Sequence, residues 1–284
     1  MSKGTLLLLG ILIIIISVII SSQIANYQFN RNVKQEVAKL FSNLENKSDV
    51  IKKEDLNTLP QSVKKWLEYS QVVGKEGIRT VRLKQQATMR LKPEDKRWMP
   101  TEAEQYFTVD KPGFIWKAKI KAAPFIPIVG RDKYHQGKGH MLIKILSLIT
   151  VADSKGKEMD QGTLLRYLAE TVWFPTAALN NYITWEEIDE HSAKATMSYG
   201  GVTASGVFTF NDKGEVVNFT ADRYREINGK YEMTTWSVNV NEYKKLDGIL
   251  IPTKGEAIWK LETGDFKWFE FHVTEIEYDK PNYY

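Results

Sequence analysis

The sequence contains no cysteine. This absence excludes disulfide bonds, thiolate metal sites, cysteine nucleophiles and lipid attachment through a cysteine. Histidine is also scarce, with four residues. His135 and His140 are five positions apart, so they point to opposite faces of a strand and miss the i, i+4 spacing of a helical zinc site. We therefore expect no metal site and no cofactor.

Sequence motifs of catalysis and nucleotide binding are missing as well. The chain has no G-x-S-x-G, H-E-x-x-H or G-x-x-x-x-G-K-[ST] pattern. The string GKG at 137–139 lacks the context of a dinucleotide loop and is typical of a hairpin turn. Net charge is +4 with both signs interspersed, which disfavours a nucleic-acid partner. We predict no catalytic residue.

The longest apolar run covers residues 6–20, interrupted only by Gly10 and Ser17. With its flanks it approaches the ~20 residues that span a bilayer. We predict that residues 1–25 are an uncleaved transmembrane anchor. The alternative is a cleaved signal peptide, whose apolar region is usually ~7–15 residues long.

The orientation of this anchor rests on two opposing signals. Lys3 precedes the run, and three basic residues follow it closely, Arg31, Lys34 and Lys39. This count argues mildly against export. A very short leader before a large domain nevertheless more often acts as a signal anchor. We predict a single-pass cell-membrane protein whose main domain is extracytoplasmic.

Residues 26–57 are predicted to form a stalk helix and a linker. Between positions 30 and 46, apolar residues recur at helical spacing, namely Val33, Val37, Leu40, Phe41 and Leu44. The alternative is a helix lying on the membrane, but a narrow apolar face without tryptophan favours a stalk. The polar string 46–57 is the predicted linker. Residues 58–284 are the predicted single β-rich domain.

The first half of that domain shows strand-like alternation. Its predicted elements are a short helix opened by Pro60, strands at 79–91, 102–109 and 114–121, and a hairpin or long strand at 133–136 and 139–152. In 79–91, apolar and polar residues alternate with period two, which is typical of a half-exposed antiparallel strand. Pro124 and Pro127 argue against a central strand at 123–132, so we predict a loop there.

An apolar helix is predicted at 160–175. Four apolar residues share one face at spacings of three and four, Leu165, Leu168, Ala169 and Val172. Asp160 is the predicted N-cap, and Pro175 ends the helix. Arg166 and Glu170 lie four positions apart and are expected to pair on the other face.

The second half reads as a run of hairpins. The predicted strands are 183–188, 193–199, 202–210, 216–225, 231–243, 249–253 continued by 254–261, and 266–278. Asn-Gly and Asp-Gly turns between alternating segments are strong hairpin signals. About a dozen strands in one sheet must curl. We predict a β-rich α+β fold: one strongly curved antiparallel meander, a partial barrel, with a few helices on its concave side, including 162–171.

Several strings together resemble a known family. They are LPQSVKKWL (59–67), GFIWKAKI (113–120), LRYLAETVWFPTAAL (165–179), ITWEEID (183–189), TASGVFTFNDKGEVV (203–217), RYRE (223–226), IPTKGEAIW (251–259) and TEIEYD (274–279). Over residues 55–280 the chain resembles an uncharacterised family of bacterial membrane-anchored proteins, a domain of unknown function. The resemblance implies an anchor and a single domain but supplies no catalytic residue. The expected shape is also similar to periplasmic lipoprotein-carrier half-barrels, which hold acyl chains in the hollow.

These observations lead to one functional hypothesis and two alternatives. The predicted ligand-binding residues are Arg166, Tyr167, Glu170, Trp173, Phe174, Trp185 and Arg223. Arginine's planar fork suits an anionic head group, although a surface pair worth under ~1 kcal/mol and ordinary core packing are the simpler explanations. We expect a membrane-anchored domain that binds a lipid or another lipophilic ligand. The alternatives are an envelope-associated hydrolase and a structural or partner-binding ectodomain.

Overall fold

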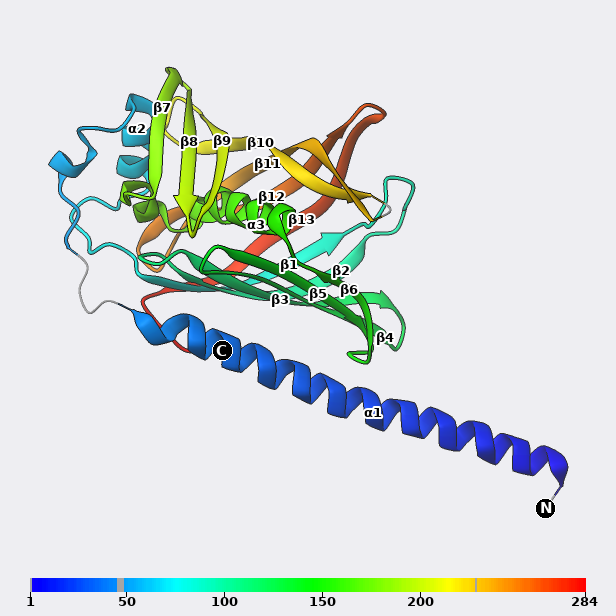
Figure 1. Ribbon diagram of the computed structural model, residues 1–284. Coiled ribbons are helices and arrows are strands. Elements are labelled where there is room, and N and C mark those ends of the chain that lie inside the picture. The colour runs from blue at the N-terminus through cyan, green and yellow to red at the C-terminus, as the bar shows by residue number, and fades with distance from the viewer. Residues whose placement is uncertain (1, 45–48, 228) are drawn as a thin grey trace.

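The computed structural model describes residues 2–44, 49–227 and 229–284. In this part of the chain, thirteen antiparallel strands form one sheet in the order β6-β5-β4-β3-β2-β1-β13-β12-β11-β10-β9-β8-β7. Figure 1 shows that the sheet curls around a helix and that a long helix runs along its outside. The predicted fold class is confirmed. The strands are β1 (Thr80–Met89), β2 (Met99–Thr108), β3 (Gly113–Ala123), β4 (Ile126–His135), β5 (Lys138–Ile145), β6 (Ile149–Ser154), β7 (Ile183–Asp189), β8 (Ser192–Tyr199), β9 (Val202–Phe210), β10 (Val216–Ile227), β11 (Lys230–Leu246), β12 (Ile249–Leu261) and β13 (Gly264–Tyr278).

Almost every strand pairs with its neighbour in sequence, as the hairpin signals predict. At the β11–β12 turn, Asp247 and Gly248 have φ values of 44° and 84°, which suit the left-handed positions of a tight hairpin turn. The exception is the pairing of β1 with β13, in which Val81 lies opposite Tyr278. This pairing joins the first block of strands to the second and makes a single sheet.

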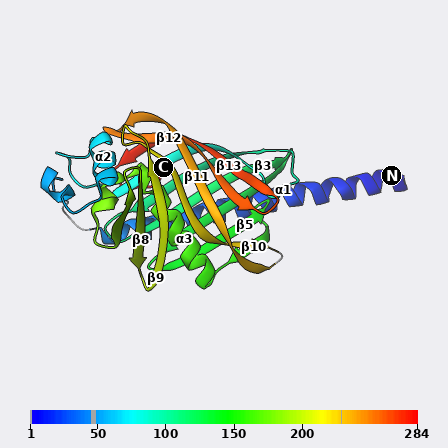
Figure 2. The ribbon, with the colours of Figure 1, turned by 90° about the horizontal axis from the view of Figure 1, so that it is seen from above.

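The helix in the hollow is α3 (Lys157–Glu170), which contacts β4 and β5 on one side and β8, β9 and β10 on the other. It therefore bridges the two ends of the curled sheet, as seen from above in Figure 2. The close approach requires a glycine in β5, because a Cβ on Gly139 would lie 2.4 Å from the carbonyl oxygen of Met159. The predicted position of the helix on the concave side is confirmed.

The predicted ends of this helix are partly wrong. It begins at Lys157 after Gly156, so Asp160 lies inside the first turn and is not the N-cap. The Asp160 carboxylate instead accepts a 2.7 Å hydrogen bond from the backbone N–H of Gly139. After Glu170 the chain tightens into two short 3₁₀ segments, η3 (Thr171–Trp173) and η4 (Pro175–Leu179), with Pro175 opening the second.

The N-terminal helix α1 (Lys3–Leu40) is continuous and docks on the convex face of the sheet. Four of its residues, Phe29, Val33, Val37 and Leu40, are buried in a cluster that includes residues of β2, β3 and β4. The predicted apolar face of the helix is therefore present, and it packs on the β-rich part of the chain. Sequence periodicity does not reveal this second contact surface. The cluster is completed by Tyr106, Ile115, Val129 and the C-terminal residues Tyr283 and Tyr284.

Charged groups fix α1 against β4. Glu36 of α1 lies 3.1 Å from the guanidinium of Arg131 and 2.6 Å from the ammonium of Lys133. Arg131 also donates a 2.8 Å hydrogen bond to the carbonyl oxygen of His140. Because Arg131 is buried, this contact constrains the helix more strongly than an exposed ion pair would.

The predicted linker is also wrong where the structure describes it, at 49–57. Ile51 and Leu56 are buried in the main core, and Lys53–Leu56 forms the short segment η2. Two isolated apolar residues in a polar string are a weak sequence signal, which explains the error. Residues 45–48 lie outside the described part of the chain, and η1 (Phe41–Asn43) precedes them. The predicted short helix follows as α2 (Gln61–Tyr69).

The predicted loop at 123–132 is a strand over most of its length, since β4 begins at Ile126. Pro127 is accommodated because it lies at the end of the ladder. Its carbonyl oxygen accepts a hydrogen bond from the N–H of Leu146, which lies beyond the end of β5. The N and O atoms of a strand residue point to the same neighbouring strand, so the missing N–H faces a turn and costs no ladder hydrogen bond.

Candidate functional site

A large cavity lies between α3 and the concave face of the sheet. Its volume is about 700 Å³, and its wall is mainly apolar. Both strand blocks contribute inward-facing side chains because the strands alternate between the two faces of the sheet. The size falls within the ~300–1,000 Å³ typical of small-molecule sites. Apolar lining residues include Met89, Trp116, Ile143, Val172, Phe219, Trp236, Trp259, Trp268 and Phe269.

The cavity opens at one end of the half-barrel. Two of its apolar lining residues reach solvent there, Leu91 with 61% and Val151 with 52% of their surface exposed. Leu91 follows the end of β1, and Val151 lies near the start of β6. The opposite end is closed, because the β4–β5 and β8–β9 turns meet so tightly that a Cβ on Gly137 would lie 2.3 Å from the carbonyl oxygen of Gly200. We call the open end the mouth.

Three charged residues form a bonded group on the cavity wall. Arg166 of α3 donates to Asp132 of β4 at 2.7 Å and to Glu170 at 2.8 Å. Glu170 also accepts a 2.7 Å hydrogen bond from Gln105. The predicted Arg166–Glu170 pair is thus present, and it faces the hollow rather than the outer surface. The guanidinium of Arg166 also lies 5.0 Å from the ring centre of Trp116, which is a cation–π contact.

Burial controls the protonation of this group. Burial raises the pKa of Glu170, although Arg166 and Gln105 oppose that rise. Burial would lower the pKa of Arg166, but the nearby Glu170 and Asp132 carboxylates outweigh it and raise that pKa. Arg166 therefore stays positively charged beside two acceptors. The group forms a fixed polar spot in an otherwise apolar wall.

Arg223 of β10 is the second cation in the cavity. Its guanidinium lies 4.7 Å from the ring centre of Trp236 and makes no hydrogen bond or ion pair with the described residues. It packs over Gly162 of α3, where a Cβ would lie 3.4 Å from the Arg223 Nε. Burial and the charge of Arg166 lower the pKa of Arg223 to about 10, so the group remains protonated at neutral pH. Its donors are available to a ligand oxygen.

The structure places four of the seven predicted ligand-binding residues on the cavity wall: Arg166, Glu170, Trp173 and Arg223. The other three lie in the packed closed end. Tyr167 donates to the carbonyl oxygen of Thr108 at 2.9 Å, and the Phe174 ring centre lies 4.8 Å from that of Phe107. Trp185 donates to the carbonyl oxygen of Ala178 at 3.0 Å.

Sequence reasoning missed the wall contributed by β1–β5 and β13. A usable signal was present, because Phe114, Trp116, Ala118 and Ile120 alternate with lysines in β3. The alternation identifies an inward face, but it does not show which part of that face packs and which part lines a space. In β3, Phe114 is in the packed core, whereas Trp116 and Ile120 line the cavity.

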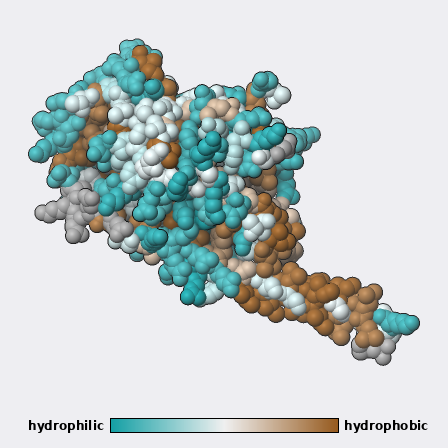
Figure 3. Space-filling view, viewed as in Figure 1, coloured by the Kyte–Doolittle hydropathy of each residue, from teal (hydrophilic) through white to brown (hydrophobic). Residues whose placement is uncertain are grey.

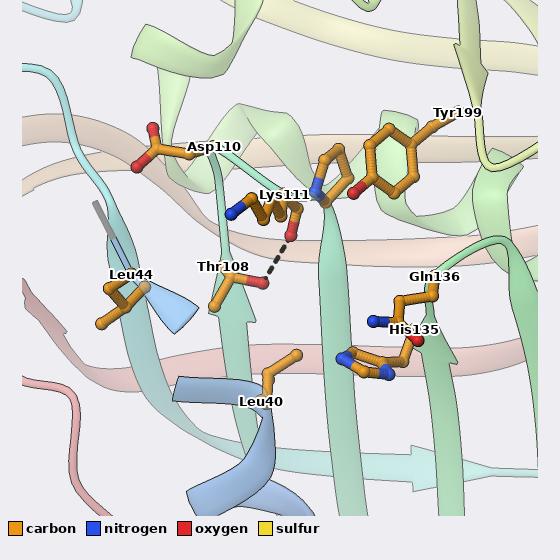
Figure 4. A pocket seen from close by; sticks show the side chains of 9 residues that line it. Leu40, Leu44, Thr108, Asp110, Lys111, His135, Gln136 and Tyr199 are labelled. Atoms are coloured by element: carbon orange, nitrogen blue, oxygen red, sulfur yellow. Dashed lines mark hydrogen bonds between the residues drawn. The ribbon is translucent and has the colours of Figure 1, made fainter. Parts of the chain in front are cut away.

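A second, smaller pocket lies near the C-terminal end of α1. Figure 4 shows His135, Gln136 and Tyr199 facing it, with Thr108 donating a 2.8 Å hydrogen bond to the carbonyl oxygen of Lys111. Its volume is about 50 Å³, which suits water better than an organic ligand, since one water occupies about 30 Å³. In the described ranges, no group of three His, Asp or Glu side chains is placed to hold a metal ion.

Comparison with models of known protein families identifies the family of this chain. The model of a family of unknown function, DUF6544, matches residues 49–271. The chain belongs to this family. The family resemblance expected from the sequence is confirmed, and a search of curated proteins gives no match.

Two solved structures are similar to this DUF6544 chain in fold. A LolA-superfamily protein from Nitrosomonas europaea has a TM-score of 0.42 and 9% identity, covering 78% of this chain and 93% of that one. A β-barrel-like DUF1849 protein from Brucella abortus has a TM-score of 0.30 and 7% identity, covering 72% of this chain and 99% of that one.

Proposed function

We propose that the chain is a membrane-tethered protein that binds a lipid or another hydrophobic molecule in its cavity. The observation that carries this proposal is the apolar cavity of about 700 Å³ with an open mouth. A purely structural ectodomain would gain stability by filling such a space, because empty apolar volume costs roughly 24 cal/mol per Å³. The unfilled cavity therefore favours a ligand-binding protein over a purely structural ectodomain.

The tether is α1. It is the one helix in the described part of the chain that is long and apolar enough to cross a membrane. Residues 2–21 make no burying contact with the rest of the protein. We infer that residues 1–25 anchor the chain in the cell membrane and that the β-rich domain lies on the extracytoplasmic side.

The charged groups in the cavity support binding better than hydrolysis. Asp132 and Glu170 are both bonded to Arg166, and a general base must be free to reach a substrate proton or a water. Such a fixed group orients the polar end of an amphiphile. An envelope hydrolase is therefore the weaker hypothesis.

Native mass spectrometry of the full chain extracted in mild detergent tests the proposal. We expect a lipid adduct on the wild-type protein that is absent from a variant with a filled cavity. Gly130 is the position of choice, because a Cβ there would touch only Trp116, at 3.8 Å, and the residue lines the cavity. Gly130→Phe adds seven carbon atoms to the space.

The expected loss can be scaled from burial. If three ligand methylenes lose their contacts at ~0.8 kcal/mol each, binding weakens by about 2.4 kcal/mol, or roughly 50-fold. Thr184→Phe is the matched control, since Thr184 is an exposed strand residue outside the cavity. Equal lipid occupancy of Gly130→Phe and wild type, or repeated absence of any adduct, contradicts the proposal.

A further inference from the structure

The mouth of the cavity carries an unusual amount of exposed apolar surface. Phe125, in the β3–β4 turn, exposes 97% of its surface, and Ile149, at the start of β6, exposes 60%. Leu91 and Val151, the two exposed residues that line the cavity, contribute to the same apolar surface. Figure 3 shows apolar surface at this end of the domain, next to the apolar part of α1. Contiguous exposed apolar surface usually marks a binding surface.

Strand pairing brings these residues to one end of the sheet. Ile128 of β4 lies opposite Ile145 of β5, so the β3–β4 turn lies beside the β5–β6 turn. The loop after β1 reaches the same end, because Thr101, near the start of β2, lies opposite Ile120 of β3. The exposed residues therefore form one rim around the mouth, and we call it the apolar rim.

The anchor helix is attached to this rim. The Ser22 hydroxyl donates a 2.8 Å hydrogen bond to the carbonyl oxygen of Leu146, in the β5–β6 turn. The Ser147 hydroxyl donates to the side-chain oxygen of Asn26 at 3.3 Å. Ser22 follows the apolar run 6–20 by two residues, which is ~3 Å along a helix axis. The membrane-spanning part of α1 thus begins level with the rim.

The docking of α1 keeps the rim in that position. From Phe29 to Leu40 the helix is packed on the convex face of the sheet, and Glu36 is bonded to Arg131 and Lys133. In Figures 1 and 2, the apolar half of α1 leaves the molecule at the end where the β3–β4 turn lies. A stiff helix fixed at two levels cannot swing the mouth away from the bilayer.

Charges near the rim fit the same surface. The loop between β1 and β2 exposes Lys92, Lys96 and Arg97 together with Glu94. Asp95 in this loop accepts a hydrogen bond from the backbone N–H of Lys92. Against these three basic side chains stand only Glu94 and Asp95, so the loop carries a small net positive charge, which attracts anionic lipid head groups.

We propose that the apolar rim rests in the interfacial layer of the bilayer that α1 spans, so that a lipid moves between membrane and cavity without crossing water. This rests on the proposed function, since it assigns a route to the same site. Phe125 and Ile149 serve as the membrane-contacting residues, and neither lines the cavity. The partner is a lipid surface rather than a protein.

The absence of cysteine makes the position of the rim directly measurable. In full-length protein in phosphatidylcholine–phosphatidylglycerol vesicles, a bimane label is placed on Phe125→Cys or on Ile188→Cys. Ile188 is the matched control, an apolar residue 54% exposed at the far end of β7. We expect nitroxide lipids to quench the label at 125 and aqueous iodide to quench the label at 188. Equal iodide quenching at both positions overturns the proposal.

The route is tested by exchange of a dansyl-labelled fatty acid, detected by energy transfer from the cavity tryptophans. Phe125→Ser combined with Ile149→Ser should slow transfer from vesicles at least ~10-fold, because the rim loses its interfacial anchors, while affinity in detergent stays unchanged. Ile188→Ser should leave both unchanged. Wild-type transfer rates in the double variant overturn the route and leave binding intact. No energy transfer in the wild type, in vesicles or detergent, refutes ligand binding and the route together.

Discussion

Replacing Arg166 with methionine tests whether the charged group on the cavity wall stabilises the folded protein. The guanidinium holds Asp132 at 2.7 Å and Glu170 at 2.8 Å. Methionine has a similar length but no charge, so the variant leaves two neighbouring carboxylates without their cation. Uncompensated charge in a partly buried site destabilises the folded state.

The magnitude follows from the burial of the three groups. Breaking a buried ion pair costs ~3–5 kcal/mol. Here the side chains of Arg166, Asp132 and Glu170 retain 15%, 22% and 12% exposure, so the low end applies, about 3 kcal/mol. For a domain of this size, ~2–4 °C per kcal/mol converts this to a fall in Tm of roughly 6–12 °C.

The pH dependence gives the prediction a second readout. Burial raises the pKa of Glu170, and Arg166→Met removes the charge that opposes this rise. For a carboxyl whose folded pKa is raised, the stabilisation is complete below the unfolded value and is lost as pH rises through the folded value. The loss of stability in Arg166→Met should therefore be larger at pH 8 than at pH 5.

Thermal unfolding of the full chain in detergent, followed by tryptophan fluorescence, measures both effects. The matched control is the triple variant Arg166→Met, Asp132→Asn and Glu170→Gln, which removes all three charges and should recover most of the lost Tm. A decrease in Tm of less than ~2 °C in Arg166→Met, or a loss of stability that does not change with pH, would refute the buried charged group. The Arg166 contacts would then contribute as little to stability as an exposed ion pair does.

Two further predictions concern Arg223 and the histidines. Arg223→Met should weaken binding of a fatty acid ~10-fold or more but leave binding of the alcohol of the same chain length unaffected, because only the carboxylate accepts a charge-assisted hydrogen bond. Isothermal titration measures the two affinities. An equal loss of affinity for the acid and the alcohol would indicate that Arg223 contributes packing alone. Burial lowers the pKa of His135 and of His140, so unfolding free energy should fall as pH drops below ~6.5, where the unfolded histidines take up protons first. His140→Gln, which removes a ring bonded to Arg131 and Asp153, should flatten this slope in urea unfolding between pH 7 and pH 5, and an unchanged slope would contradict it.

The fold was largely predictable because its contacts are mostly local. Alternating residues fix strand faces, and turns such as Asp247–Gly248 fix which strands pair. The errors have a common cause in contacts between distant segments. The face of α1 that carries Val33 and Val37 was identified correctly, but its partner surface is formed by β2–β4 and by Tyr283 and Tyr284. Periodicity alone does not distinguish such a docked helix from a free one.

The site was predictable only in part, from the helical stretch that carries Arg166 and from Arg223 of the RYRE string. Arg166 and Glu170 were found because their spacing places them on one face of α3, and that face meets the hollow. Tyr167 and Phe174 belong to the same stretch, but they point into the packed end, against Thr108 and Phe107. A sequence gives the identity of inward residues, whereas the volume left between them depends on how far the whole sheet curls.

The pairing of β1 with β13 also sets the order of events during biosynthesis. Val81 finds its partner at Tyr278, 197 positions later, and at ~5–20 residues per second the ribosome needs roughly 10–40 s to make that stretch. Throughout this interval the edge of β1 offers unpaired N–H and C=O groups to any passing strand. That edge is therefore protected only after the last strand of the chain has emerged.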